Sequence, residues 1–212
     1  MKISLVNMPF GRIDYPSLAL TQIQSLLEQY YAGAVKINLF YINHDFAREL
    51  GMENYQLFIG NSVYIQSRSP STNNNTHKSR TENSIYNGVG DWLFRKTAFP
   101  FAEDNETEYF KKYFRKNRSL IERIKDCRSQ VDHILDLCIH KYKLVSYDIV
   151  AFTSLFHQQM ANIALSRKLK KLNPSLITIL GGSNNEGKSA DVFLKECGDV
   201  FDFFLQEAAM ED

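Results

Sequence analysis

The feature that most constrains the fold is a strand–helix–strand pattern in the last third of the chain. An apolar run at residues 148–152 ends in Thr153-Ser154, and a second run at residues 176–180 stops at Gly181-Gly182. The segment between them, residues 157–172, has helical spacing and ends in basic residues followed by Asn-Pro. Apolar runs of strand length on either side of a helix predict a β-α-β unit with two parallel strands.

A second unit of the same kind opens the chain. Residues 3–8 and 35–42 are apolar runs of strand length, and a helix is expected from residue 17 to about residue 30. Pro16 suits the first position of that helix. We expect a right-handed connection between the two strands. The helix is expected to present one apolar face, made by Leu18, Ile23, Leu26 and Leu27.

A mainly helical insertion, residues 44–145, separates these two units. Helical patterns occur at residues 44–58, 103–113 and 119–145, and the only tryptophan lies in the segment 86–99. The helix at 119–145 should face the core, because its apolar residues recur mostly at intervals of three and four. Residues 67–83 are almost wholly polar and predict a mobile surface loop or disordered segment. This segment could be a tolerated insertion without a role or a surface for a partner.

After residue 187, the sequence predicts a helix at 190–197 and a last strand at 201–205. The fold class is therefore α/β, a Rossmann-like (flavodoxin-like) parallel sheet of five strands in the order 2-1-3-4-5, in a single domain spanning residues 1–212. In such a sheet, ligands bind beyond the carboxyl ends of the strands, where the strand order reverses. Residues 7–10 and 153–155 should meet at this crevice, with Gly181-Gly182 and residues 206–207 beside them.

Composition restricts the class of partner and the compartment. The formal net charge of +1 argues against nucleic acid, which normally binds a basic face. No apolar stretch reaches the roughly 18 residues of a membrane span, and the N-terminal sequence lacks the pattern of a signal peptide. The three cysteines, Cys127, Cys138 and Cys197, have no CxxC spacing, which disfavours disulfide and zinc frameworks. A cytoplasmic protein is expected.

Other possible sites have simpler explanations. Gly88-Val89-Gly90 lacks the third glycine and the preceding strand of a nucleotide-binding fingerprint. His133 and His140, near Cys138, could form a metal site, but no third ligand supports one and a solvated pair is the simpler interpretation. Glu186 and Glu207 could act as acid or base, although carboxylates also suit the start of a helix.

The crevice residues themselves allow two interpretations. A glycine pair at a strand end lets a ligand lie against the backbone, because no Cβ is in the way. Thr153 and Ser154, at the neighbouring strand end, offer hydroxyl groups for hydrogen bonds. Alternatively, Gly181-Gly182 only makes a tight turn from strand to helix. The residue types alone leave both open.

The order of these motifs resembles a known family. Thr153-x-Leu155 followed by Gly181-Gly182 is similar to the S-x-L and G-G elements of cobalamin-binding Rossmann-like domains. VNMPFG, YPSLAL, DWLF, DIVAFTSLFHQQMANIALSRKLK and TILGGSNNEG, in this order, look like the N-terminal region of radical SAM enzymes that mature ribosomally made peptides. Many of those enzymes are C-methyltransferases, with a cobalamin domain before a (β/α) barrel.

The resemblance implies a cobalamin-binding module that acts on a ribosomally made precursor peptide, together with a radical SAM barrel in cis or in trans. In the family, the nucleotide tail of cobalamin enters a pocket lined by the two motifs. The expected cofactor-binding residues are Pro9, Phe10, Thr153, Ser154, Leu155, Phe156, Gly181, Gly182, Ser183 and Glu207. No catalytic residue and no metal ligand is expected in this chain, and no membrane or nucleic acid among its partners.

Two departures from the family limit the implied chemistry. The D-x-H-x-x-G motif, whose histidine coordinates cobalt in many cobalamin domains, is absent: Asn7-Met8-Pro9-Phe10-Gly11 stands after the first strand. Cobalamin would be held without that ligand; His157 is nearest the crevice and more simply makes a local hydrogen bond. The C-x-x-x-C-x-x-C motif is also absent, so an iron–sulfur cluster and S-adenosylmethionine belong to a missing or separate barrel.

Two other hypotheses remain beside this one. The chain could be a degenerate docking or partner module of a split or truncated enzyme that no longer binds cobalamin. It could also be an independent enzyme that uses another nucleotide in the same crevice, although the missing fingerprint glycines disfavour that.

Overall fold

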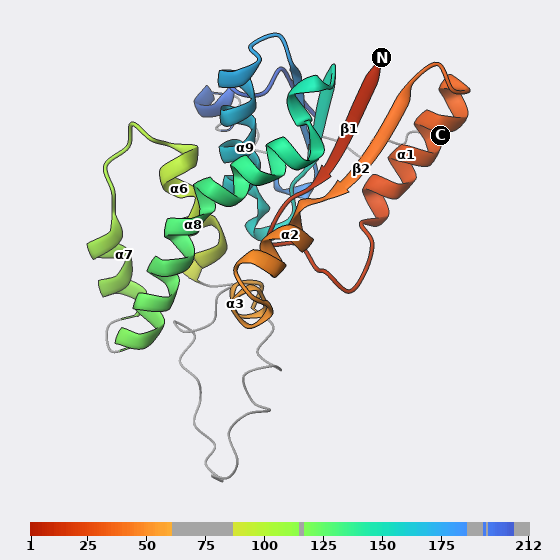
Figure 1. Ribbon diagram of the computed structural model, residues 1–212. Helices are drawn as coiled ribbons and strands as arrows, with labels where there is room; N and C mark the ends of the chain where they lie inside the picture. Colours follow the sequence, from red (N-terminus) through yellow and green to blue (C-terminus); the bar gives the residue numbers. More distant parts are fainter. Residues whose placement is uncertain (61–86, 115–116, 186–192, 194, 206–212) are drawn as a thin grey trace.

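The structure is a computed structural model that describes residues 1–60, 87–114, 117–185, 193 and 195–205. Its centre is one parallel sheet in the order β2-β1-β3-β4-β5 (Figure 1), which confirms the strand order expected from the sequence. The strands are β1 (Lys2–Asn7), β2 (Lys36–Tyr41), β3 (Ile149–Thr153), β4 (Ile177–Gly181) and β5 (Phe203–Phe204). Strand β5, at the edge, is shorter than the run at 201–205 predicts.

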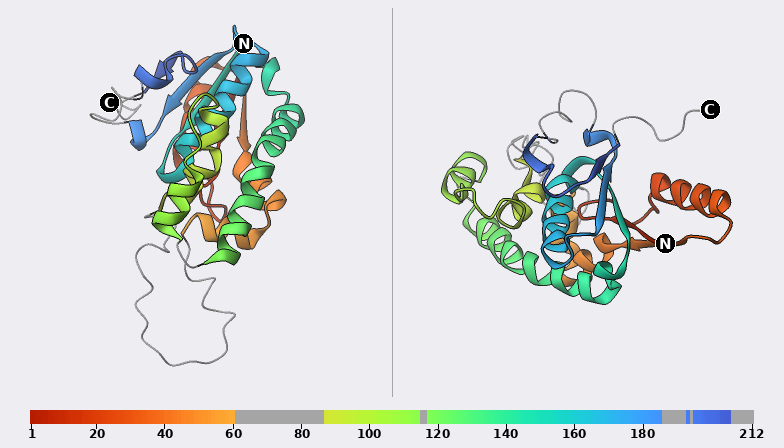
Figure 2. Two further views of the ribbon diagram at one scale, coloured as in Figure 1. Left: turned by 90° about the vertical axis from the view of Figure 1, so that its left-hand side faces the viewer. Right: turned by 90° about the horizontal axis from the view of Figure 1, so that it is seen from above.

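The pleat of the sheet divides its side chains between two faces. Val6, Val150 and Leu180 are buried on the face that packs against most of the helices. Ile3, Leu5 and Ile37 lie on the opposite face, where they form a smaller cluster with Leu20 of α1 (Leu18–Tyr31). Figure 2 shows α1 on one side of the sheet and the other large helices on the opposite side.

Helix α1 begins one residue later than expected. The side chain of Ser17 caps it by accepting a hydrogen bond from the backbone N–H of Leu20, so Pro16 lies outside the helix and not at its first position. The expected apolar face is also partly wrong. Ile23 and Leu27 pack on the sheet with Leu20, whereas Leu18 and Leu26 point to solvent.

The helical pattern at 44–58 is two helices and not one. Helix α2 (Ile42–Glu49) ends before Gly51, which has a φ of +83°, and α3 (Met52–Phe58) follows. A positive φ cannot continue a right-handed helix, and glycine adopts it without steric cost. The break turns α3 so that Tyr55 and Phe58 enter the core.

The rest of the insertion consists of α6 (Val89–Ala98), α7 (Glu106–Tyr113) and the long α8 (Arg118–Tyr142). The core-facing stripe expected for α8 is confirmed, because residues from Ile124 to Ile139 at that spacing are buried. A short 3-10 turn, η2 (Leu144–Ser146), leads from α8 into β3. The insertion therefore returns the chain to the centre of the sheet.

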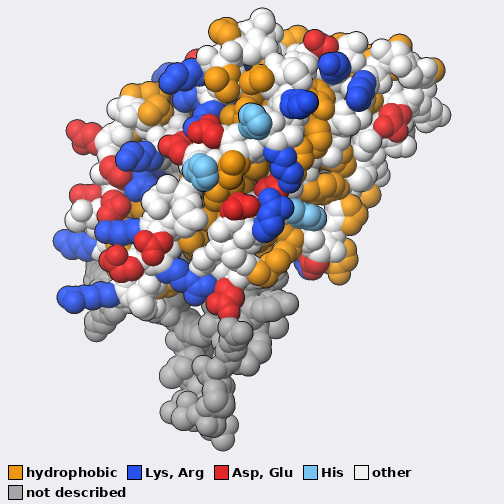
Figure 3. Space-filling view, in the orientation of Figure 1, with side chains coloured by type: hydrophobic (Ala, Val, Ile, Leu, Met, Phe, Trp, Pro, Cys, Tyr) orange, Lys and Arg blue, Asp and Glu red, His pale blue; other side chains and the backbone are white. Residues whose placement is uncertain are grey.

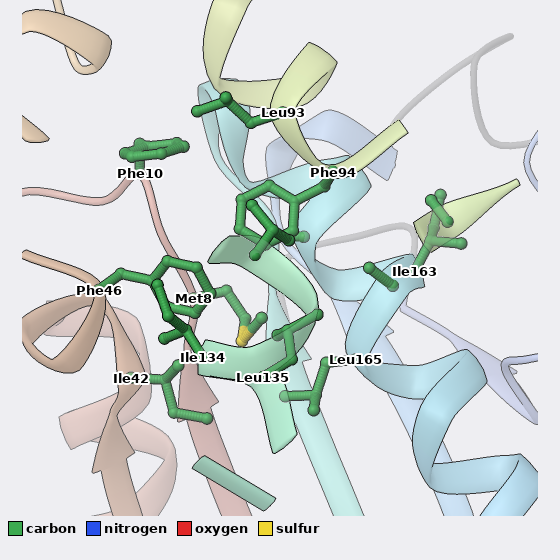
Figure 4. Close-up of a cluster of buried hydrophobic side chains, with 14 of the residues drawn as sticks. Met8, Phe10, Ile42, Phe46, Leu93, Phe94, Ile134, Leu135, Ile163 and Leu165 are labelled. Carbon is green, nitrogen blue, oxygen red and sulfur yellow. The ribbon is translucent and has the colours of Figure 1, made fainter. Parts of the chain in front are cut away.

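One hydrophobic core joins the insertion to the sheet. Met8 after β1, Phe46 of α2, Phe94 of α6 and Leu165 of α9 (Gln159–Leu172) belong to the same cluster of buried side chains, which Figure 4 shows converging between the helices. The expected polar loop at 67–83, Glu186 and most of the expected helix at 190–197 lie outside the described residues.

Candidate functional site

The candidate site lies at the carboxyl ends of β1, β3 and β4, as expected for this strand order. Thr153, the last residue of β3, pairs in register with Gly181, the last residue of β4. Strand β3 continues into the 3-10 turn η3 (Phe156–Gln158) and then α9, and β4 continues into the turn η4 (Ser183–Asn185). The sequence prediction that these two strand ends adjoin is confirmed.

Gln158 closes the gap between the ends of β1 and β3. Its side-chain nitrogen donates hydrogen bonds to Oδ1 of Asn7 (2.9 Å) and to the carbonyl of Met8 (2.5 Å). Its side-chain oxygen accepts a hydrogen bond from the backbone N–H of Leu155 (3.1 Å). The side chain is buried, and unmade hydrogen bonds there would carry a desolvation penalty. The side chain of Gln158 therefore links the carboxyl ends of β1 and β3 at the point where the strand order reverses.

Gly182 is required by the packing of its own chain. Its φ is +104°, and a Cβ there would lie 2.4 Å from the carbonyl oxygen of Ser154 and 2.7 Å from its backbone nitrogen. No side chain fits at those distances. This glycine allows its backbone to approach the end of β3 closely. Of the two interpretations of the glycine pair, the tight turn therefore explains Gly182.

Gly181 differs from Gly182 in both respects. It has no left-handed backbone, and a Cβ at this position would make ordinary contacts of 3.5 Å with Leu205. Nothing in the packing of the described residues requires glycine here. The other interpretation, in which a missing side chain lets a ligand lie against the backbone, therefore depends on Gly181.

Ser154 is a buried structural link and not an open hydroxyl. Its N–H donates to the carbonyl of Gly181 (2.8 Å), and its carbonyl accepts from the N–H of Asn184 (3.3 Å). The side-chain amide of Asn184 also donates to the Ser154 hydroxyl (3.1 Å). These bonds fix the end of β3 against the turn after β4. The sequence analysis did not single out Asn184, and only its place in the polar segment after Gly182 pointed to it.

Thr153 and Gly181 lie on the α1 side of the sheet, because they alternate with the buried core residues Phe152 and Leu180. Both are half-buried, and Leu155, Gly182 and Ser183 next to them are exposed. Below them on the same face lie Ala151 and Ile179, also half-buried. The surface at this strand end thus has a small, apolar floor and a hydroxyl and backbone groups at its rim. Such groups can form hydrogen bonds but do not exchange protons near neutral pH.

The loop after β1 turns its aromatic residue away from this surface. Phe10 is buried and its ring packs against Tyr55 (5.1 Å between centroids), Phe58 (5.5 Å) and Phe94 (6.1 Å). Figure 4 shows Phe10 on the side of Leu93 and Phe94, within the hydrophobic core. Of this loop, the carbonyl of Met8 and the backbone of Gly11 lie beside Gln158, and Pro9 is buried. The backbone of Phe156 lies in η3, and Glu207 is outside the described residues.

His157 also points away from the strand ends, toward α6. Its Cβ lies under Gly90, and its Nδ1 is 3.6 Å from a carboxylate oxygen of Asp91. Asp91 in turn accepts a hydrogen bond from the N–H of Met160 at the start of α9 (3.1 Å). The imidazole therefore contributes to the contact between α6 and α9. No group of three or more potential metal ligands assembles among the described residues.

The three cysteines are buried in different parts of the structure. Burial raises the pKa of Cys127 to about 11, of Cys138 to about 12 and of Cys197 to about 11. Thiols of this kind remain protonated at neutral pH, and the thiolate is the form that binds metal. His133 and His140 lie on the exposed side of α8, while Cys138 faces the core.

A separate pocket of about 230 Å³ lies between α2 and α8 and adjoins the buried carboxylate of Asp45. Asp45 accepts hydrogen bonds from Lys141 (2.6 Å), Tyr142 (2.5 Å) and Arg48 (2.8 Å). Burial alone raises the pKa of this carboxyl, but the bonds from Lys141 and Tyr142 outweigh it and hold the pKa below its ordinary value. The charges are thus already paired within the protein, and the network joins α8 to α2.

The distribution of charged side chains on one face of the molecule gives no indication of a charged partner. On the face shown in Figure 3, basic and acidic side chains are interspersed, without an extended patch of one sign. Within the described part of the chain, none of the helices combines the length and the apolar character needed to span a membrane.

Comparison with protein-family models finds no match, and neither the curated proteins nor the solved structures provide a significant relative.

Proposed function

We propose that this chain is the cobalamin-binding module of a radical SAM system that modifies a ribosomally made peptide, with C-methylation as the reaction class. The observation that carries the proposal is the register pair Thr153–Gly181 at the ends of β3 and β4, on a sheet face that remains partly open. Thr153-x-Leu155 and Gly181-Gly182, the two elements that resemble those lining the tail pocket in the family, lie at these two strand ends. Cobalamin, when bound, would supply a methyl carrier to a barrel in cis or in trans.

The residues at the strand ends fit the flat, aromatic tail of such a cofactor. Ala151 and Ile179 would lie beneath it, and the tail would approach the backbone of Gly181 beside Leu205, because Gly181 has no side chain there. Thr153 would offer its hydroxyl, and Ser183 its exposed backbone and hydroxyl. Ser154, Gln158 and Gly182 would act indirectly, because their hydrogen bonds and close packing hold the strand ends in place.

This arrangement would hold the cofactor without an imidazole ligand from the protein. The loop after β1 offers backbone and the buried Phe10, and His157 packs against α6. The chemistry requiring an iron–sulfur cluster would be supplied by the barrel, because the buried cysteines of this chain have neither the spacing nor the ionisation of cluster ligands.

The proposal predicts that the purified chain retains hydroxocobalamin through gel filtration, with the visible spectrum of the bound cofactor. Gly181→Ala should weaken binding by about tenfold, corresponding to about 1.4 kcal/mol, because its methyl group occupies the space assigned to the tail. Ser175→Ala, in the exposed turn before β4, is the matched control and should bind like the parent chain.

Two results would contradict the proposal. One is a folded parent chain that retains no chromophore, which would favour the docking module without cofactor. The other is retention that Gly181→Ala leaves unchanged, which would place the cofactor elsewhere on the chain.

A further inference from the structure

Half of the α1 side of the sheet has no helix over it among the described residues. Helix α1 packs on β1 and β2, through Leu20, Ile23 and Leu27. The opposite face of the sheet is covered by α6, α8 and α9, as Figure 2 shows in the view from above. Strands β3, β4 and β5 therefore carry a helix layer on one face, whereas an apolar sheet normally requires cover on both.

The open half-sheet is uncharged and apolar apart from Thr153, and at its inner edge Ile149 and Ala151 pack against the cluster beneath α1. Its side chains are alternate residues of the three strands, and none is charged: they are Ile149, Ala151, Thr153, Ile177, Ile179, Gly181 and Phe203. Phe203 is 56% exposed and Ile177 37% exposed. Isolated apolar side chains on a surface are ordinary, but a contiguous apolar set marks an interaction site.

Helix α1 has a second apolar stripe that its own sheet covers only at Ile23. Ala19, Ile23, Leu26 and Tyr30 recur at intervals of four, three and four, which places them on one side of the helix. Leu26 is 46% exposed and Tyr30 is 82% exposed. Because the connection from β1 to β2 is right-handed, this stripe lies on the flank of α1 that points toward β3.

The composition of α1 is that of a covered helix. Among its fourteen residues, only Glu28 is charged, and the outer positions hold Leu18, Gln22, Ser25 and Gln29. A solvent-facing helix normally carries several charged residues, whereas the centre of a protein–protein interface is depleted of them and enriched in aromatic residues. The outer side of α1 therefore has the composition of an interface.

We propose that a second copy of this chain covers the surface, in a two-fold symmetric dimer with α1 of each copy over the part of the open half-sheet of the other that carries Ile177 and Phe203. In each copy, α1 covers β1 and β2, and the neighbouring strands have no helix over them on that face among the described residues. When two copies are related by a two-fold axis, α1 of each copy lies over uncovered strands of the other. The result is a layer of two helices between two sheets. This is an isologous interface, in which one patch serves both partners.

The available area agrees with a dimer. Aromatic side chains bury about 150–250 Å² each, so the exposed parts of Tyr30 and Phe203, together with those of Leu18, Leu26 and Ile177, provide several hundred Å² per copy. A standard interface buries about 800 Å² per partner, including a polar rim. The uncharged surface offers no complementary charge for a strongly acidic or basic partner, and a second copy brings the matching apolar stripe.

This inference does not depend on cofactor binding. It uses α1, Ile177 and Phe203, whereas the cofactor tail is assigned to Ala151, Thr153, Ile179 and Gly181, so the substitutions that test it leave the residues of the cofactor site intact. Hydroxocobalamin retention and dimerisation can therefore fail separately.

The test is sedimentation equilibrium of the full chain over a wide range of concentrations. The parent chain should be a dimer that dissociates on dilution. Leu26→Lys and Phe203→Glu should each weaken it by about 100-fold or more, because each places two charges in the apolar interface. Leu172→Glu is the matched control: Leu172 is 61% exposed at the end of α9, on the other side of the sheet, and its substitution should leave the dimer unchanged.

A mixture distinguishes reciprocal docking from any other dimer. If α1 of one copy contacts β5 of the other, equimolar Leu26→Lys and Phe203→Glu proteins should form a heterodimer in which one contact pairs opposite charges and the other is native. Circular dichroism of each variant checks that it is folded. A monomeric parent chain, a dimer as sensitive to Leu172→Glu as to Leu26→Lys, or no recovery in the mixture would each overturn the proposal.

Discussion

Gly182 and Gly181 are neighbours in sequence with opposite structural requirements. At Gly182, any side chain would combine a φ of +104° with a Cβ only 2.4 Å from a carbonyl oxygen of the adjacent strand end. At Gly181, the same Cβ would make only van der Waals contact with Leu205. A pair that looks uniform in the sequence therefore contains one glycine that the backbone requires and one at which an added Cβ would make only ordinary contacts.

We predict that Gly182→Ala lowers the free energy of unfolding by about 2–4 kcal/mol, since backbone strain and a backbone clash add. Gly181→Ala should change it by less than about 1 kcal/mol, because a less flexible residue in a compatible conformation restricts the unfolded chain without strain in the folded one. Urea unfolding of the two variants measures both values. Equal destabilisation would show that the Gly181 site is also closed by packing.

Side-chain direction at the strand ends was beyond what the sequence could predict. The apolar runs identified which strands carry the site, and Thr153 and Gly181 lie where expected. Phe10 was assigned to the same surface because it follows β1, but its ring enters the core with Tyr55 and Phe94. Gln158 was overlooked, because a glutamine in the first turn of a helix has no pattern that distinguishes a buried brace from a solvated side chain.

At the scale of elements, the contact between α2 and α8 depends on one buried carboxylate. Asp45 accepts hydrogen bonds from Arg48 of its own helix and from Lys141 and Tyr142 of α8, elements far apart in the sequence. Its pKa is lower in the folded chain than in the unfolded chain, where about 3.9 is expected. A carboxylate with a depressed pKa contributes stability above the unfolded value and loses that contribution as the pH falls through the folded value.

We therefore predict that Asp45→Asn reduces the free energy of unfolding at neutral pH by about 2 kcal/mol, a typical value for charged hydrogen bonds. The difference from the parent chain should shrink as the pH falls below about 4, because the unfolded chain then binds a proton at this carboxyl before the folded chain does. Urea unfolding at a series of pH values measures this difference. Asp132→Asn, an exposed partner of Lys168, is the control and should have little effect at any pH. A constant difference down to acidic pH would mean that the charge contributes nothing.

Element boundaries followed local chemistry that the periodicity did not capture. The apolar pattern at 44–58 continues through Gly51, so it predicted one helix where a positive φ makes two. Leu18 and Leu26 fit the apolar face of α1 by periodicity, yet the narrow contact of one helix with two strands accommodates only Leu20, Ile23 and Leu27. The surplus apolar residues on α1 are the ones from which a second copy is inferred.

At the scale of the whole molecule, the insertion between β2 and β3 shares one core with the sheet. Phe94 of α6 lies 6.1 Å from Phe10 and 5.3 Å from Phe46, measured between ring centroids, and all three are buried with Val150 of β3. The strand order could be predicted from sequence because each run and its connection is a local pattern. The position of the insertion could not, because it depends on contacts between aromatic residues far apart in the chain.

Trp92, the only tryptophan of the chain, reports on this insertion. Its ring stacks on Tyr109 at 4.6 Å, the guanidinium of Arg128 lies 3.9 Å from its centroid, and its indole N–H donates to Asn105. These contacts tie α6, α7 and α8 together. Unfolding of the insertion should therefore change the fluorescence of Trp92, while far-UV circular dichroism follows the sheet and helices as a whole.

Because insertion and sheet share their core, we predict that the two signals have the same midpoint in urea, as in a single cooperative transition. Phe94→Ala should shift both midpoints equally, by a loss of about 3–5 kcal/mol, and Leu172→Ala, at an exposed site, should shift neither. A fluorescence transition at lower urea than the dichroism transition would contradict this. It would mean that the insertion is a separate unit docked on the sheet, and that the carboxyl ends of β1 and β3 are braced by Gln158 alone.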